Sequence, residues 1–139
     1  MSTNDNADSA IFNANIHSHV HRGCFVAYDD AGGIETLVCK PSGALATKIA
    51  GCVEDERIYG MQVVRFVKKG RTKVRSDGSG AINQGDKLVI ANHDGEVMAK
   101  PASVGVDPFD VVGTAVQSAP ATADYLFDAD IDVDTEYTS

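Results

Sequence analysis

The apolar residues of this chain come in short runs, most of which end at Gly, Asp or Asn. The runs are rich in Val and Ile, whose branched side chains pack well on a pleated sheet. Only residues 44–50 (ALATKIA) suit a helix, and they are enough for one or two turns. This pattern predicts an all-β fold.

Turn residues between neighbouring runs predict hairpins. Residues 24–28 (CFVAY) precede the turn 29–33 (DDAGG) and the run 34–39, and residues 87–91 (KLVIA) precede the turn 92–95 (NHDG) and the run 96–99. Residues 62–67 and 71–75, joined by KKG, are interpreted as a basic hairpin. Residues 111–116 and 125–133 are the last predicted strands. In the second of these, apolar residues alternate with aspartates, which predicts one buried and one solvated face.

A weak internal repeat accompanies these strands. Residues 39–41 (CKP) match residues 99–101 (AKP), 60 positions later, and residues 49–53 (IAGCV) match residues 111–115 (VVGTA), 62 positions later. Residues 61–66 match residues 123–128 at the same offset of 62. We expect two related β units of about 45 residues, packed face to face or closed into a small barrel. Because the matches are short and use common residues, chance similarity is the alternative.

The chain of 139 residues is long enough for one domain. We expect residues 1–14 to form a flexible arm, because they lack both apolar periods, and residues 15–139 to form a single all-β domain. The opening MSTNDNADSA is polar and acidic, so no export signal is predicted. No run approaches the roughly 18 apolar residues of a membrane helix, so a soluble protein without a membrane partner is expected.

The charged residues are segregated along the chain. Six of the twelve basic residues lie within eleven positions: Arg65, Lys68, Lys69, Arg71, Lys73 and Arg75. Six of the twenty acidic residues lie near the C-terminus: Asp124, Asp128, Asp130, Asp132, Asp134 and Glu136. The net charge of -8 argues against a nucleic-acid partner, because phosphate binding needs a positive field. The basic strand could contact an acidic patch on a partner protein, with plain solvation as an equal alternative.

His17, His19 and His21 alternate, so in a strand their imidazoles lie on one face. Such a set binds a metal ion when a carboxylate such as Asp29 or Asp30 completes the ligands. An exposed strand or a subunit contact is the favoured interpretation, because no acidic ligand stands at a motif-like distance. We therefore expect no cofactor. The alternating aspartates are interpreted as a solvated face rather than as calcium ligands.

Sequence signatures of catalysis are missing. The chain has no GxSxG, HExxH or Walker sequence, and residues 77–80 (DGSG) are interpreted as a flexible turn. Cys24, Cys39 and Cys52 form no CxxC pair, so buried reduced thiols are expected. These observations predict a protein that is not an enzyme.

Residues 70–133 resemble a family of tailed-phage capsid cement or decoration proteins. The resemblance depends on the basic alternating strand, on residues 81–89 (AINQGDKLV), on the turn Asp94-Gly95 and on residues 111–119 (VVGTAVQSA). Residues 50–53 (AGCV) look like the upstream counterpart of the last segment. The His-rich opening and the acidic final strand depart from the usual members of this family.

The resemblance implies a β-barrel, β-clip or β-tulip-like domain on the outer surface of a phage head. Such proteins often form trimers that clamp adjacent major capsid subunits, so the implied location is the virion, after assembly in the host cytoplasm. Two alternatives remain open: a cupin-like metal enzyme that uses the three histidines, and a carbohydrate-binding module, which the absence of Trp disfavours. The candidate capsid or subunit contacts are Ile11, Phe12, Ile16, His17, His19, His21, Arg65, Lys68, Lys69, Arg71, Lys73 and Arg75.

Overall fold

The computed structural model describes residues 7–12, 21–28, 37–41, 43, 49–54, 63–101 and 111–133, and the regular elements in these ranges are all β-strands. The strands are β1 (Ala7–Phe12), β2 (Phe25–Tyr28), β3 (Leu37–Cys39), β4 (Ile49–Val53), β5 (Val63–Val67), β6 (Lys69–Arg75), β7 (Lys87–Ile90), β8 (Val97–Ala99), β9 (Val111–Ala115) and β10 (Leu126–Asp132). The all-β prediction is confirmed. Within these ranges no helix is long and apolar enough to cross a membrane.

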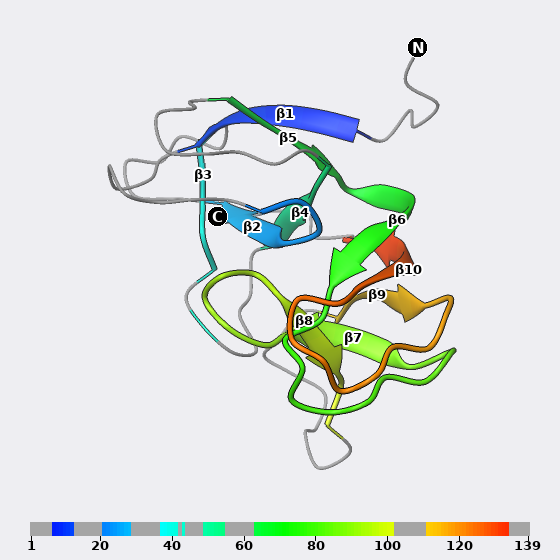
Figure 1. The fold of residues 1–139 in the computed structure, drawn as a ribbon. Helices are drawn as coiled ribbons and strands as arrows, with labels where there is room; N and C mark the ends of the chain where they lie inside the picture. Colours follow the sequence, from blue (N-terminus) through cyan, green and yellow to red (C-terminus); the bar gives the residue numbers. More distant parts are fainter. Residues whose placement is uncertain are drawn as a thin grey trace.

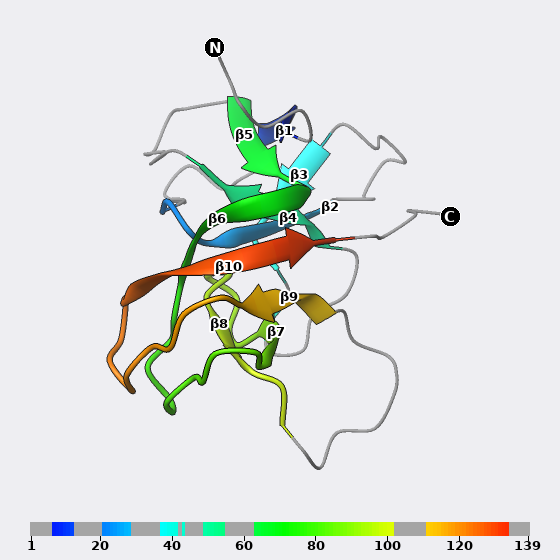
Figure 2. The same ribbon diagram turned by 90° about the vertical axis from the view of Figure 1, so that its right-hand side faces the viewer.

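The strands form two groups of five (Figure 1). In the first group the order is β1-β3-β2-β4-β5, and β1 also pairs with β5, so the group closes on itself. The second group is a sheet in the order β6-β10-β9-β7-β8. Figure 2 shows β6 and β10 of the second group across the middle of the molecule, where the two strands are paired.

The two groups repeat the same strand order. In each, the first strand pairs with the fifth, the fifth with the fourth, the fourth with the second and the second with the third. The parallel contact of β1 with β3 has a counterpart in a parallel bridge between Ser76, which follows β6, and Val97 in β8. The ten strands are therefore two copies of one five-stranded unit.

The register of the two units also agrees at the expected offset of 62. Pairing of β2 with β4 shifts after Val26, and pairing of β7 with β9 shifts after Leu88, 62 positions later. The paired residues are Phe25–Cys52, Val26–Gly51 and Ala27–Ile49 in the first unit, and Lys87–Thr114, Leu88–Gly113 and Val89–Val111 in the second. A shared irregularity is a stricter test than short residue matches, so the structure supports the internal repeat.

The turns that lead into β2 and β7 are equivalent as well. Gly23 and Gly85 both have a positive φ, of 87° and 93°, which glycine adopts without steric cost. The amide of Gly23 donates to the carbonyl of Val53 at 2.9 Å, and the amide of Gly85 donates to the carbonyl of Ala115 at 2.8 Å. The repeat therefore includes the loops at this end of each unit.

One hydrophobic core joins the two units. Phe25, Ile49 and Cys52 of the first unit belong to the same buried cluster as Leu88 and Phe127 of the second. Strand β10 shows how the sequence builds it: Phe127, Ala129 and Ile131 are buried and alternate with aspartates that lie at the surface. The predicted two-faced strand is confirmed.

Some predictions about the strands need correction. The two hairpins are confirmed as β2–β3 and β7–β8. Part of the predicted N-terminal arm, Ala7–Phe12, is strand β1 of the first unit, because its backbone pairs with β5 and β3. The predicted basic hairpin is wrong, since β5 pairs with β1 and β4 whereas β6 pairs with β10. Of the possible helical segment, Ile49 and Ala50 lie in β4, and residues 44–48 are outside the described ranges.

Candidate interaction surfaces

The basic residues of β6 lie beside the acidic residues of β10. Antiparallel pairing places Lys69 opposite Asp132, Arg71 opposite Asp130 and Lys73 opposite Asp128. All six side chains belong to the solvated face of the strands, because the residues between them, such as Phe127 and Ala129, are buried. The acidic patch that the basic strand contacts is therefore on the chain itself.

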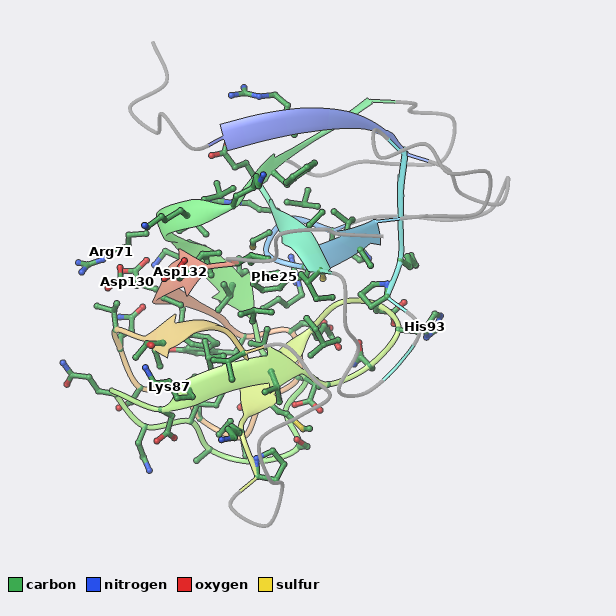
Figure 3. The ribbon with its side chains drawn as sticks, turned by 180° about the vertical axis from the view of Figure 1, so that it is seen from behind. Phe25, Arg71, Lys87, His93, Asp130 and Asp132 are labelled. Atoms are coloured by element: carbon green, nitrogen blue, oxygen red, sulfur yellow. The ribbon has the colours of Figure 1, made fainter. Side chains whose placement is uncertain are left out.

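Two of these cross-strand pairs are ion pairs. The Nε atom of Arg71 donates to Oδ1 of Asp130 at 3.1 Å, and Nζ of Lys73 lies 3.1 Å from Oδ1 of Asp128. Figure 3 shows Arg71 and Asp130 together at one side of the molecule. The Arg71 and Asp130 side chains are 61% and 56% exposed, so this pair stabilises the fold by about 0.2–1 kcal/mol at most.

A polar row continues from Arg71 across the sheet. Asp130 lies opposite Thr114 of β9, and Thr114 lies opposite Lys87 of β7. The Nζ atom of Lys87 donates to Oγ1 of Thr114 at 3.1 Å. The row thus crosses four strands, and in it Arg71 faces a carboxylate whereas Lys87 faces a hydroxyl group.

The remaining basic candidates are dispersed. Arg65 is paired with Glu54 at 3.8 Å, and Arg75 donates from Nε to the carbonyl of Arg22 at 3.0 Å. Lys68 is half-buried, and its carbonyl accepts a bond from the amide of Val133 at 2.9 Å. Of the basic set, the structure therefore places only Lys69, Arg71 and Lys73 opposite aspartates on one face.

The arm and histidine candidates fall partly outside the described residues. Ile11 and Phe12 lie in β1, where their backbones are paired with β5 and β3. His21 lies in the turn before β2, and its carbonyl accepts a bond from the amide of Cys24 at 3.1 Å. Ile16, His17 and His19 are not in the described ranges, so the proposed metal site is not placed. Within those ranges, no group of three or more His, Cys, Asp or Glu side chains could hold a metal ion.

Two of the three cysteines are buried as free thiols, as predicted. Burial raises the pKa of Cys24 to about 12, and burial also raises the pKa of Cys52 well above its usual value. The Sγ atom of Cys52 lies 3.5 Å from the carbonyl of Lys73, to which the thiol donates. Thiolates are the reactive form of cysteine, so these two side chains are core residues rather than nucleophiles.

A pair of carboxyl groups lies where the second unit contacts the first. Glu96 follows the β7–β8 turn, whose Gly95 carbonyl accepts a bond from the amide of Phe25 at 2.8 Å. Burial and a hydrogen bond with Asp124 raise the pKa of Glu96 to about 7, and the same hydrogen bond lowers the pKa of Asp124. Protonated Glu96 therefore donates to ionised Asp124 below neutral pH. The sequence missed this pair, because the two residues are far apart in the chain and neither belongs to a motif.

We expect the free energy of unfolding to fall as the pH rises from about 5 to about 8.5. The pKa of Glu96 is higher in the folded chain than its ordinary value of 4.5, so the folded chain binds this proton more tightly. Its contribution is present at low pH and is lost as the pH rises through about 7. Urea unfolding at several pH values measures the change. Glu96→Gln should flatten this part of the profile, and an unchanged profile would contradict the assignment.

Comparison with known proteins identifies a shared fold. The chain is similar to the solved structure of the head fiber gp8.5 N base in bacteriophage phi29, with a TM-score of 0.59 and 20% sequence identity. The alignment covers 91% of this chain and 95% of that one. No family model and no curated protein matches the chain. At this identity the likeness shows the fold, which extends over nearly the whole chain.

Proposed function

We propose that this protein is a structural component of a phage head, which binds the outer surface of the shell and clamps adjacent major capsid subunits. The observation that supports it most is the fold likeness to a head fiber base over 91% of the chain. This likeness was found from the structure, whereas the cement-protein resemblance was drawn from residues 70–133 of the sequence. The fold likeness and the sequence resemblance therefore both support a place among the proteins of phage heads.

The architecture suits a structural role. Two five-stranded units share one core, so the body is rigid and can transmit force between the surfaces it contacts. Many copies, each adding a modest binding free energy at a joint between subunits, would raise the resistance of the shell to disruption. No turnover of a substrate is needed for this role, and we propose that the protein is not an enzyme.

The charge distribution supports a protein partner rather than a nucleic acid. The net charge is -8, and the basic row of β6 is neutralised by the acids of β10. Phosphate binding depends on basic groups that can replace the counterions of the nucleic acid. Arg71 and Lys73 already face carboxylates, so we propose the major capsid protein as the partner, with a homotrimer as the assembled form.

Binding to phage heads tests the proposal. Heads of the phage that carries this protein, prepared without it, should bind the purified protein in a saturable way and should then disrupt at a higher temperature. Sedimentation of the mixture measures the binding, and a fluorescent dye that reports DNA release measures the disruption. The mass of the free protein in solution tests the trimer separately. Heads that stay bare at saturating protein would overturn the proposed function.

A further inference from the structure

We propose that the contact with the head shell is made by an uncharged tip, formed by residues 79–85 and 116–123 at one end of the second unit. This inference rests on the proposed function and specifies its contact surface. Figure 2 shows the two loops side by side, in green and orange, below β10. Their sequences, SGAINQG and VQSAPATA, contain no charged residue, although 23% of the whole chain is charged.

Most of the tip is exposed. Ile82 and Ala119 are buried, Val116 is half-buried, and the other members are at the surface. The exposed residues are Ser79, Gly80, Ala81, Asn83, Gln84, Gly85, Gln117, Ser118, Pro120, Ala121, Thr122 and Ala123. Tyr125, which is 40% exposed, lies next to this surface. Tyr is enriched and charges are depleted at the centre of protein interfaces, so the composition fits a protein partner.

The two loops are joined into one body by main-chain and side-chain bonds. The amides of Ile82 and Ala119 donate to each other's carbonyls at 2.9 Å and 2.8 Å. The amide of Gln84 donates to Oγ of Ser118 at 3.3 Å, and the amide of Asp128 donates to Oε1 of Gln117 at 2.8 Å. A surface ordered in this way, with short side chains, loses little conformational freedom when it binds.

The internal repeat allows the sequence of the tip to be compared with the first half of the chain. The positions 62 residues before 116–119 are Glu54, Asp55, Glu56 and Arg57, all charged. The positions equivalent to 79–84 include Arg22 and three histidines. Along the sequence, the positions at this offset carry charges and histidines in the first half of the chain and no charge in the second. The difference belongs to what the second unit contacts, because burying an unpaired charge in an interface costs binding free energy.

The partner that fits this tip is an uncharged polar protein surface, and we assign it to the outer face of a shell subunit. Such a contact depends on shape and hydrogen bonds, so its affinity should change less than about threefold between roughly 50 mM and 300 mM salt. A contact through the charged faces of β6 and β10 would weaken steeply over that range. The salt dependence of binding therefore shows, without any mutation, which of the two surfaces contacts the head.

Charge insertion at the tip is the direct test. Ala121→Glu and Thr122→Glu should each weaken binding to heads by roughly tenfold or more. Ala121→Gln and Thr122→Gln add side chains of the same size without charge and should bind within about threefold of wild type. His93→Glu adds a charge on the side opposite Arg71 (Figure 3), at an exposed position, and should bind normally. Thermal unfolding of each variant checks that it is folded.

The outcomes distinguish the two proposals. If wild type binds heads and both Glu variants bind equally well, the tip assignment is wrong and the proposed function stands. If wild type leaves heads bare, both are wrong. A change in the solution mass of the Glu variants would show that the tip joins copies of this chain, which would also overturn its assignment to the shell. Steep loss of wild-type affinity with salt would move the contact to the charged strands.

Discussion

Gly95→Ala is expected to lower the free energy of unfolding by about 3–5 kcal/mol. Gly95 has a φ of 88°, a conformation that costs a residue with a Cβ about 1–2 kcal/mol. A Cβ at this position would also overlap the backbone nitrogen and oxygen of Phe25 in β2. The substitution would push the β7–β8 turn away from the first unit and break the bond from Phe25 to Gly95. Urea unfolding followed by circular dichroism measures the loss, since the chain has no Trp.

Gly85→Ala provides the matched control for this substitution. Gly85 has a similar φ of 93°, but nothing lies within 4 Å of a Cβ built there. Its replacement should lower the free energy of unfolding only by the cost of a positive φ, about 1–2 kcal/mol. The difference between the two variants therefore measures how tightly the turn is packed on β2. Equal losses would show that the second unit does not depend on this contact.

Local features of the sequence predicted much of the fold. The turns DDAGG and NHDG marked two hairpins, and the alternation of residues 125–133 identified both faces of β10. A turn or a two-residue period involves only a few consecutive residues, so it can be recognised without knowing how distant segments pack. The repeat was predicted by comparing segments 62 positions apart, and this comparison does not require knowing how the segments pack.

Long-range pairing was not predicted. Nothing local to Arg71 shows that Asp130, 59 positions later, lies on the neighbouring strand. A usable signal was present, since basic residues alternate along β6 and acidic residues alternate along β10 over the same length. Cross-strand pairs of opposite charge favour pairing, and like charges disfavour it. Strand β1 was missed for a related reason. Its sequence lacks an apolar period, and the strand forms because its backbone pairs with two other strands.

The candidate surfaces also differ in how far the sequence could predict them. The basic residues were prominent in the sequence because they are charged and clustered, yet the structure places Lys69, Arg71 and Lys73 opposite acids of the same chain. The uncharged tip has no motif and no unusual residue, so only its exposure and its comparison with the first unit make it visible. A function therefore has to be argued from the residues of a surface rather than from the repeated fold.

Gly51→Ala and Gly113→Ala are expected to destabilise the protein by similar amounts, about 2–4 kcal/mol each. The two glycines are equivalent members of β4 and β9, 62 positions apart. A Cβ on Gly51 would overlap the carbonyl oxygen of Val67, and a Cβ on Gly113 would overlap that of Asp130. Neither glycine has a positive φ, so the whole cost comes from forcing the neighbouring strand apart.

Gly80→Ala is the control for these two substitutions, because Gly80 is exposed, has no positive φ and has nothing within 4 Å of a built Cβ. Its replacement should change the free energy of unfolding by less than about 0.5 kcal/mol. If the two units share one core, either strand substitution should unfold the whole chain in a single transition, because neither unit can bury its apolar face alone. A second transition, or a loss at only one of the two glycines, would show that the units are independent and are not packed alike.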